Sequence, residues 1–156
     1  MKVLFLDIDG VLNSTGRARN NIPYSEFIPE GLKFLRYLVS HGVLLVVSST
    51  WRIGRSLSQL SEILTVPVFA TTPVSQSDSC RGDEIQQWLD LNERPEYCIV
   101  DDDSDMLPNQ RPMFVQTNHE YGMQSYHMAE ICRVLSLPSN PSDQGAGLPG
   151  SAALRR

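Results

Sequence analysis

Three short, nearly continuous apolar runs along the chain predict strands that are buried on both faces. They are KVLFLD (residues 2–7), VLLVVS (43–48) and YCIVD (97–101), and each run ends in a polar residue. Continuous apolar runs of this length are typical of a parallel sheet covered by helices. Shorter apolar runs at residues 66–70 and 113–115 complete the set of predicted strands.

Helical periodicity occurs between these strands. In residues 29–41, apolar side chains recur every three or four positions, with a proline in the first turn and a glycine just beyond the end. Residues 82–92 and 124–135 show the same period. Strands that alternate with helices predict right-handed crossovers and a three-layer α/β fold, Rossmann-like, with a mainly parallel sheet.

Composition predicts one domain and a short tail. The chain has 156 residues, of which 41% are hydrophobic and 20% charged, as in an ordinary globular protein with a single core. From Ser136 onward proline, glycine and serine dominate and few leucines remain. We therefore expect a folded domain over residues 1–135 and a disordered tail over residues 136–156.

Several features favour a cytoplasmic protein without a membrane partner. No apolar run approaches the roughly 20 residues of a membrane span. Asp7 and Asp9 interrupt the apolar N-terminal stretch before it reaches the length of a signal peptide core. The three cysteines have no C-x-x-C spacing, which predicts neither a disulfide framework nor a zinc site and fits a reducing compartment.

Candidate chemistry lies where the predicted strands end. In a parallel sheet, ligand sites lie beyond the carboxyl ends of the strands. The residues found there are Asp7 and Asp9 after the first strand, Ser48 and Ser49 after the second, and Asp101 and Asp102 after the fourth. Carboxylates two residues apart repel each other unless a cation or a shared proton relieves them, and Mg²⁺ prefers such oxygen ligands. The net charge of −5 argues against a general nucleic-acid coat, but a cation at these acids would offset part of it, so a nucleic-acid substrate is not excluded.

The segments VLFLDIDGVLN, VLLVVSSTWR and YCIVDDDSD resemble three motifs of the haloacid dehalogenase (HAD) superfamily, and the resemblance covers most of residues 1–135. It implies an HAD-like fold and a Mg²⁺-dependent phosphatase that acts through an aspartyl-phosphate. It assigns the nucleophile to Asp7 and the general acid/base to Asp9. It further implies that Ser48, or Ser49 if the strand runs one residue further, binds the substrate phosphate. By the same resemblance Asp102 is a metal ligand supported by Asp101, together with Asp7 and Asp9.

One motif departs from the superfamily pattern. Where the superfamily has a lysine ahead of the helix that leads into the acidic strand, this sequence has Arg81, in CRGDEIQQWL. Arginine stays charged and binds phosphate, but its planar guanidinium is not a spatial copy of an ammonium group. The resemblance therefore implies a phosphate-binding role for Arg81.

A narrower resemblance bears on the substrate. The segments SSTWR, RGDEIQQWL, IVDDD and QTNHEYGM are similar to the small HAD domains of "Swiss Army Knife" RNA repair proteins, and more distantly to polynucleotide 3′-phosphatases. Only residues 12–28 are available for a cap, so we expect a minimal cap or none. An open site is more compatible with a large substrate, such as a nucleic-acid end or a phosphoprotein, than with a small metabolite that must be enclosed. The leading expectation is a phosphorylated polynucleotide end or a nucleotide.

Other functions remain open. They are a general small-molecule phosphomonoesterase and a catalytically silent, HAD-like phosphate-binding module. A signalling receiver domain is disfavoured, because there the phosphorylated aspartate ends the third strand and the basic residue follows the fifth.

Several side chains near the motifs have a structural interpretation. Thr50 is expected to cap the next helix, and packing is favoured over nucleotide binding for Trp51 and Arg52. Asp103 and Asp105 are expected to lie in a solvated loop. The sequence does not decide whether His119 and Tyr121 meet a substrate.

Overall fold

Five parallel strands form one sheet at the centre of the computed structural model, which describes residues 1–76 and 78–138. The strands are β1 (Lys2–Leu6), β2 (Val43–Val47), β3 (Ala70–Thr71), β4 (Glu96–Asp101) and β5 (Phe114–Gln116). Their order in the sheet is β3-β2-β1-β4-β5, and every neighbouring pair is parallel. The prediction of a Rossmann-like parallel sheet is confirmed.

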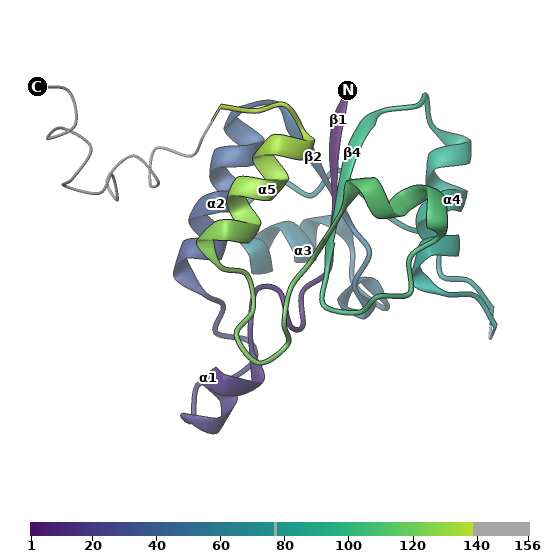
Figure 1. The fold of residues 1–156 in the computed structure, drawn as a ribbon. Helices are drawn as coiled ribbons and strands as arrows, with labels where there is room; N and C mark the ends of the chain where they lie inside the picture. The colour runs from purple at the N-terminus through teal and green to yellow at the C-terminus, as the bar shows by residue number, and fades with distance from the viewer. Residues whose placement is uncertain (77, 139–156) are drawn as a thin grey trace, which may run out of the picture.

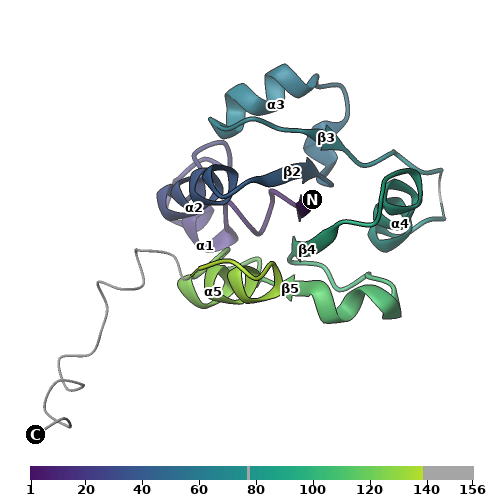
Figure 2. The same ribbon diagram turned by 90° about the horizontal axis from the view of Figure 1, so that it is seen from above.

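Helices cover both faces of this sheet (Figures 1 and 2). The helices are α1 (Thr15–Arg19), α2 (Pro29–Ser40), α3 (Leu57–Leu64), α4 (Arg81–Leu91) and α5 (Ser125–Val134), with 3₁₀ helices η1 (Thr50–Arg52) and η2 (Pro108–Met113). Helices α2 and α5 lie on one face, and α4 lies on the other. The layers are therefore helix, sheet and helix.

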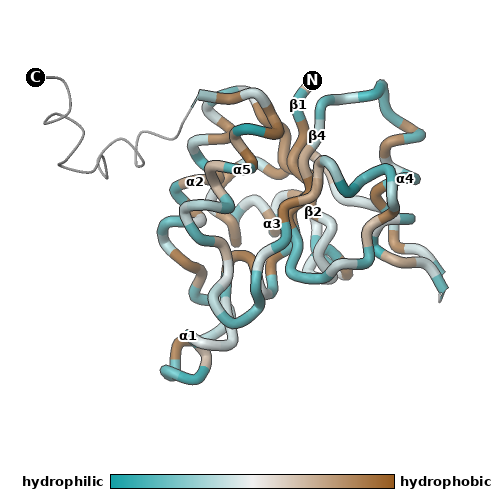
Figure 3. Tube along the Cα trace, viewed as in Figure 1, coloured by the Kyte–Doolittle hydropathy of each residue, from teal (hydrophilic) through white to brown (hydrophobic). Residues whose placement is uncertain are grey.

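The alternation of side chains along β1 explains why the chain has two hydrophobic clusters. Leu4 and Leu6 point into the larger cluster, which α2, α3 and α5 share, while Val3 and Phe5 point into a smaller one beneath α4. All four side chains are fully buried. Figure 3 accordingly shows the central strands as the most hydrophobic part of the trace. A strand with both faces covered reads as a continuous apolar run, which is the pattern that predicts β1.

The structure corrects one predicted strand and adds one helix. The predicted strand at 66–70 is instead the two-residue β3, because Pro67 has no N–H to donate and pairing with β2 starts only where the Phe69 amide reaches the Leu45 carbonyl. Helix α3 is not among the predicted helices, although Ser56 and Gln59 form a capping box at its start.

The segment between β1 and α2 contains a single short helix, α1, as expected for a minimal cap (Figure 1). Two backbone hydrogen bonds tie its start to a distant turn: the Thr15 amide donates to the His119 carbonyl and the Gly16 amide donates to the Glu120 carbonyl. A Cβ on Gly16 would lie 2.6 Å from the Glu120 carbonyl oxygen, so only glycine permits this approach. We call residues 14–28 the flap.

The first residues of the predicted tail contact the domain. Leu137 packs against the larger cluster, its amide donates to the Cys132 carbonyl, and the Tyr37 hydroxyl donates to the Pro138 carbonyl at 2.5 Å. The rest of the predicted tail, residues 139–156, lies outside the described residues. Within the described residues, no helix has the length and apolar character that a membrane crossing requires.

Two truncations should separate these parts of the C-terminal region. Ending the chain after Pro138 should leave the melting temperature unchanged, because residues 139–156 contain only two leucines that could be buried. Ending it after Leu135 should cost about 1–2 kcal/mol and lower the melting temperature by several degrees, because the Leu137 contact is lost. Thermal unfolding followed by circular dichroism measures both. Equal melting temperatures for the two truncations would contradict the role given to Leu137.

Candidate active site

The sheet register brings three predicted residues to one point. The Asp7 amide donates to the Val100 carbonyl of β4, and the Ser48 amide donates to the Leu6 carbonyl of β1. Asp7, Ser48 and Asp101 therefore follow or end three adjacent strands at the same edge of the sheet. All three are buried, with Asp7 6% exposed and Asp101 1% exposed.

Three carboxylates gather at this edge. Asp7, Asp101 and Asp102 each offer one oxygen, and these oxygens lie within 4.8 Å of one another. Gly10 makes room for the third: its φ is +80°, and a Cβ there would lie 2.4 Å from Asp102 Oδ2. Carboxylate oxygens at this spacing suit a hard divalent cation such as Mg²⁺.

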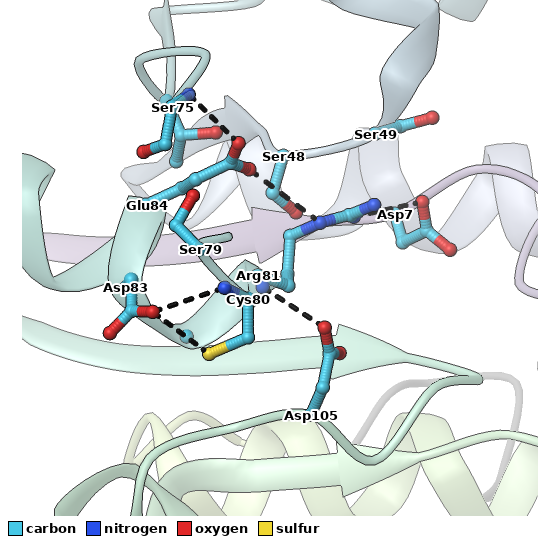
Figure 4. Close-up of polar contacts among 12 residues, drawn as sticks. Asp7, Ser48, Ser49, Ser75, Ser79, Cys80, Arg81, Asp83, Glu84 and Asp105 are labelled. Atoms are coloured by element: carbon cyan, nitrogen blue, oxygen red, sulfur yellow. Dashed lines mark hydrogen bonds and ion pairs between the residues drawn. The ribbon is translucent and has the colours of Figure 1, made fainter. Parts of the chain in front are cut away.

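Arg81 is the cation that the structure places among these acids. Its Nη1 donates to Asp7 Oδ1 at 3.2 Å (Figure 4). The same nitrogen donates to Asp101 Oδ2 at 3.1 Å. It is the first residue of α4, and its backbone amide donates to Asp105 Oδ2 at 3.0 Å. Asp105, expected to be only a solvated loop residue, is exposed but fixes the start of the helix that carries Arg81. The substituted arginine thus reaches the site.

Burial is the largest influence on the pKa values of Asp7 and Asp101. Burial raises the pKa of Asp7 to about 6, although the Arg81 guanidinium acts in the opposite direction. Burial also raises the pKa of Asp101, to about 8, with a further increase from the negative charge of Asp7 and a partial offset from Arg81. One guanidinium therefore does not compensate the charge of both carboxylates, and an added cation would stabilise their ionised forms.

The two serines that the sequence left as alternatives differ in what their hydroxyls do. Ser48 Oγ is fully buried and, among the described residues, has no hydrogen-bond partner. Ser49 Oγ accepts a hydrogen bond from the Trp51 amide at 3.2 Å and so caps η1, a role expected for Thr50. In Figure 4 the Ser48 side chain extends toward Arg81 and the Ser49 side chain points away. Of the two serines, Ser48 is therefore the one whose hydroxyl extends toward Arg81 without a hydrogen-bond partner among the described residues.

Arg52 is a structural residue of the site. Its side chain is buried, and it donates from Nε to the Thr72 carbonyl, from Nη1 to the Ser48 and Ser49 carbonyls, and from Nη2 to the Pro73 carbonyl and to Glu84 Oε2. All five N–H groups of the guanidinium are used, which supports packing over nucleotide binding. Arg52 thereby joins the end of β2, the segment after β3, and α4.

Glu84 links Arg52 to Arg81. Its Oε2 accepts from Arg52 at 2.8 Å. The same oxygen lies 3.9 Å from Arg81 Nε, and Oε1 accepts from the Ser75 amide at 3.1 Å (Figure 4). The Glu84 side chain is only 12% exposed. Glu84, one turn further along α4, therefore helps to position the Arg81 side chain.

Asp9 lies outside the carboxylate group, although the sequence resemblance counted it among the metal ligands. After β1 the chain turns, and Asp9 is exposed, whereas Asp7 and Asp101 are buried. Its Oδ1 accepts from Asn13 Nδ2 at 2.8 Å. Asn13 is buried and also donates to the Tyr24 carbonyl, while its Oδ1 accepts from the Gly10 amide. Sequence reasoning missed Asn13, because an asparagine after an apolar pair has no distinguishing pattern.

A pocket of about 410 Å³ opens beside Asp9. It is lined by Asp9, Gly10, Thr15, Tyr24, Trp51, Asp102 and His119. His119, whose role was left open by the sequence, is one of the lining residues, and Trp51 both packs against Phe27 and lines the pocket. The pocket thus joins the flap, η1 and the turn after β5 to the edge of the carboxylate group.

Comparison with protein families gave one match that spans these residues. The family model described as "HAD domain in Swiss Army Knife RNA repair proteins" matches residues 3–128, which include every candidate site residue. Comparison with curated proteins and with solved structures gave no significant match.

Replacing Arg52 should test its structural role. The Arg52→Met variant should lose about 3–5 kcal/mol of stability, because Glu84 becomes a nearly buried charge without its partner and four carbonyls lose a donor. Arg36→Met, which removes an exposed arginine of α2, serves as the control and should unfold like the wild type. Urea unfolding measures both. An Arg52→Met variant as stable as Arg36→Met would contradict the assignment.

The raised pKa values predict how stability depends on pH in metal-free protein. Folded Asp7 and Asp101 bind protons more tightly than the same residues in the unfolded chain, so stability should fall as pH rises from about 4 to about 8. Asp101→Asn should flatten this slope because one of the two groups is gone. Mg²⁺ should raise the melting temperature of the wild type more at pH 8 than at pH 5. Thermal unfolding in EDTA and in Mg²⁺ measures this, and parallel pH profiles for wild type and Asp101→Asn would refute it.

Proposed function

Because the chain belongs to the family of HAD domains found in Swiss Army Knife RNA repair proteins, we propose that it is a magnesium-dependent phosphohydrolase in which Asp7 forms an aspartyl-phosphate. One observation carries this proposal. The buried Asp7 carboxylate shares a site with two further acids and with the Arg81 guanidinium. A nucleophile, a cation-binding group and an anion-binding group are what phosphoryl transfer needs at one point.

The metal would be held by Asp7, Asp101 and Asp102, whose oxygens form the acidic group. When bound, Mg²⁺ neutralises charge that otherwise keeps an anionic nucleophile away from an anionic phosphate. Asp9 is exposed and outside this group, so we assign it to proton transfer and not to the metal. Its bond from Asn13 fixes one carboxylate oxygen and leaves the other for the substrate.

Ser48 and Arg81 would bind the non-bridging phosphate oxygens. A buried hydroxyl without a partner costs free energy, and a phosphate oxygen would supply the missing acceptor for Ser48 Oγ. The Arg81 guanidinium already lies against the Asp7 carboxylate, so a phosphate drawn to it would meet the nucleophile. Positioning and charge stabilisation are most of what a protein contributes to this reaction.

The reaction has two half reactions. In the first, an Asp7 oxygen attacks phosphorus, the bond from phosphorus to the leaving oxygen breaks, and Asp9 gives that oxygen a proton. In the second, water attacks the aspartyl-phosphate, Asp9 takes the proton from the water, and phosphate leaves with the Asp7 carboxylate restored. Asp9 thus returns to its starting state after each turnover.

The shape of the site favours a large substrate. Between β1 and α2 the flap contributes only the five-residue helix α1, which does not enclose a small metabolite. A phosphorylated polynucleotide end or a nucleotide fits an open site of this kind, and RNA repair would be the corresponding context. A general small-molecule phosphomonoesterase is the alternative.

The covalent mechanism predicts that Asp7 and Asp9 are not equivalent. Asp7→Asn should abolish turnover and the covalent adduct. Asp9→Asn should keep the nucleophile, so an aryl phosphate with a good leaving group should still phosphorylate Asp7 while release of phosphate stalls. Intact mass after rapid acid quenching measures the adduct, and phosphate release measures turnover.

Two comparisons make this experiment decisive. Wild-type activity in excess EDTA should disappear and should return with added Mg²⁺, whereas full activity in chelator would disprove the metal requirement. An adduct on Asp7→Asn, or on another aspartate, would show that the nucleophile has been misassigned.

A further inference from the structure

The pocket beside Asp9 has aromatic walls that the reaction itself does not require. Tyr24 of the flap is 47% exposed, and Trp51 of η1 is partly exposed. Both line the pocket, as do Asp9 and Asp102. A group that leaves phosphorus toward Asp9 would therefore enter a pocket that these two rings also line.

The backbone that carries Tyr24 is anchored by the same side chain that binds Asp9. Asn13 donates to the Asp9 carboxylate and to the Tyr24 carbonyl. The Trp51 ring packs against Phe27, with ring centroids 5.5 Å apart. The Thr15 amide of the flap donates to the His119 carbonyl. The segments around the pocket are thus fastened to one another, and fastening of this kind lowers the entropy cost of binding.

We propose that this pocket binds the nucleoside that carries the phosphomonoester, with its base stacked against Tyr24 and Trp51. This inference rests on the proposed function, because it places the leaving group beside the acid/base. A volume of about 410 Å³ lies in the range of small-ligand sites and exceeds what a single phenyl ring needs. Thr15 and His119 supply polar groups in the same wall for the hydroxyls of a sugar. Stacking accepts any base, since every base has a π face.

Arg55 extends this surface beyond the pocket. Its guanidinium lies 5.1 Å from the centre of the Trp51 ring, and its Nη1 donates to the Trp51 carbonyl at 3.0 Å. The residue is exposed, so the cation also faces solvent. Aromatic side chains with a cation beside them are the arrangement by which proteins hold single-stranded nucleic acids. The terminal nucleoside of a polynucleotide and a free nucleotide present the same chemistry to the pocket.

A substrate panel tests the inference. The substrates are adenosine 3′-monophosphate, adenosine 5′-monophosphate, an adenine trinucleotide with a terminal phosphate, glycerol phosphate and phosphotyrosine, all with Mg²⁺. At least one adenosine compound should have a higher kcat/KM than glycerol phosphate and phosphotyrosine. Preference for the trinucleotide over both mononucleotides identifies a polynucleotide end as the source, and equal rates identify free nucleotides.

Substitutions then test whether Tyr24 causes the preference for adenosine compounds. Tyr24→Ala should raise KM for the preferred adenosine compound roughly 5- to 100-fold, the range for removing an aromatic that stacks on a base. Tyr24→Phe keeps the ring and should keep the preference. Tyr126→Ala, which removes a tyrosine of α5 that is 67% exposed and outside the pocket lining, is the matched control and should behave as wild type.

The outcomes distinguish this inference from the proposed function. If phosphomonoesters are hydrolysed but glycerol phosphate is preferred, or if Tyr24→Ala keeps the full adenosine preference, the nucleoside pocket is disproved and the phosphohydrolase stands. A preference for phosphotyrosine would disprove the nucleoside pocket and would indicate a phosphoprotein substrate. If nothing is hydrolysed, calorimetric titration with adenosine 3′-monophosphate decides: binding that Tyr24→Ala weakens supports the pocket, and no binding overturns it.

Discussion

The Arg81 guanidinium lies between the buried carboxylates of Asp7 and Asp101, and the rest of the site is arranged around this ion pair. Two like charges in a buried place are stable only if something offsets them, and the raised pKa values show that one arginine does not suffice. Helix α4 must therefore start at a fixed point. The Asp105 carboxylate fixes the Arg81 backbone amide, and Glu84 helps to position the Arg81 side chain. Gly82 allows the start of α4 to approach Leu107, because a Cβ on Gly82 would lie 2.7 Å from the Leu107 amide nitrogen.

Residues next to the apolar runs could be placed from the sequence. Asp7, Ser48 and Asp101 each follow or end a run that must be buried on both faces, and the parallel register then brings them together. Arg81 was assigned only through the resemblance to HAD proteins, because no pattern in the sequence relates a basic residue ahead of α4 to the end of β1. The resemblance also grouped Asp9 with the metal ligands; in the structure Asp9 is exposed and is not one of the three acids whose oxygens lie together.

Features that depend on contacts between distant segments could not be predicted. The sequence around Arg52 has the same local pattern whether its guanidinium faces water or, as here, five acceptors from three segments. The pocket needs Tyr24, Trp51 and His119, which come from the flap, η1 and the turn after β5, and no periodicity determines the relative positions of these segments. Strand β3 was misplaced for the same reason, since its two residues are defined by pairing with β2 and not by their own apolar character.

The hydrogen bonds that fasten the flap also determine where an insertion into the chain would be tolerated. Its base is fixed by the bonds of Thr15 and Gly16 to the turn after β5, and its far end returns through the bond from the Ile28 amide to the Leu12 carbonyl. The tip between these points is different: Asn20 and Asn21 are exposed, and Asn21 has a φ of 62° in a tight turn. Loop tips of this kind accept inserted sequence. An entire covering domain could be added there while both fastenings, and the acids beneath them, stay in place.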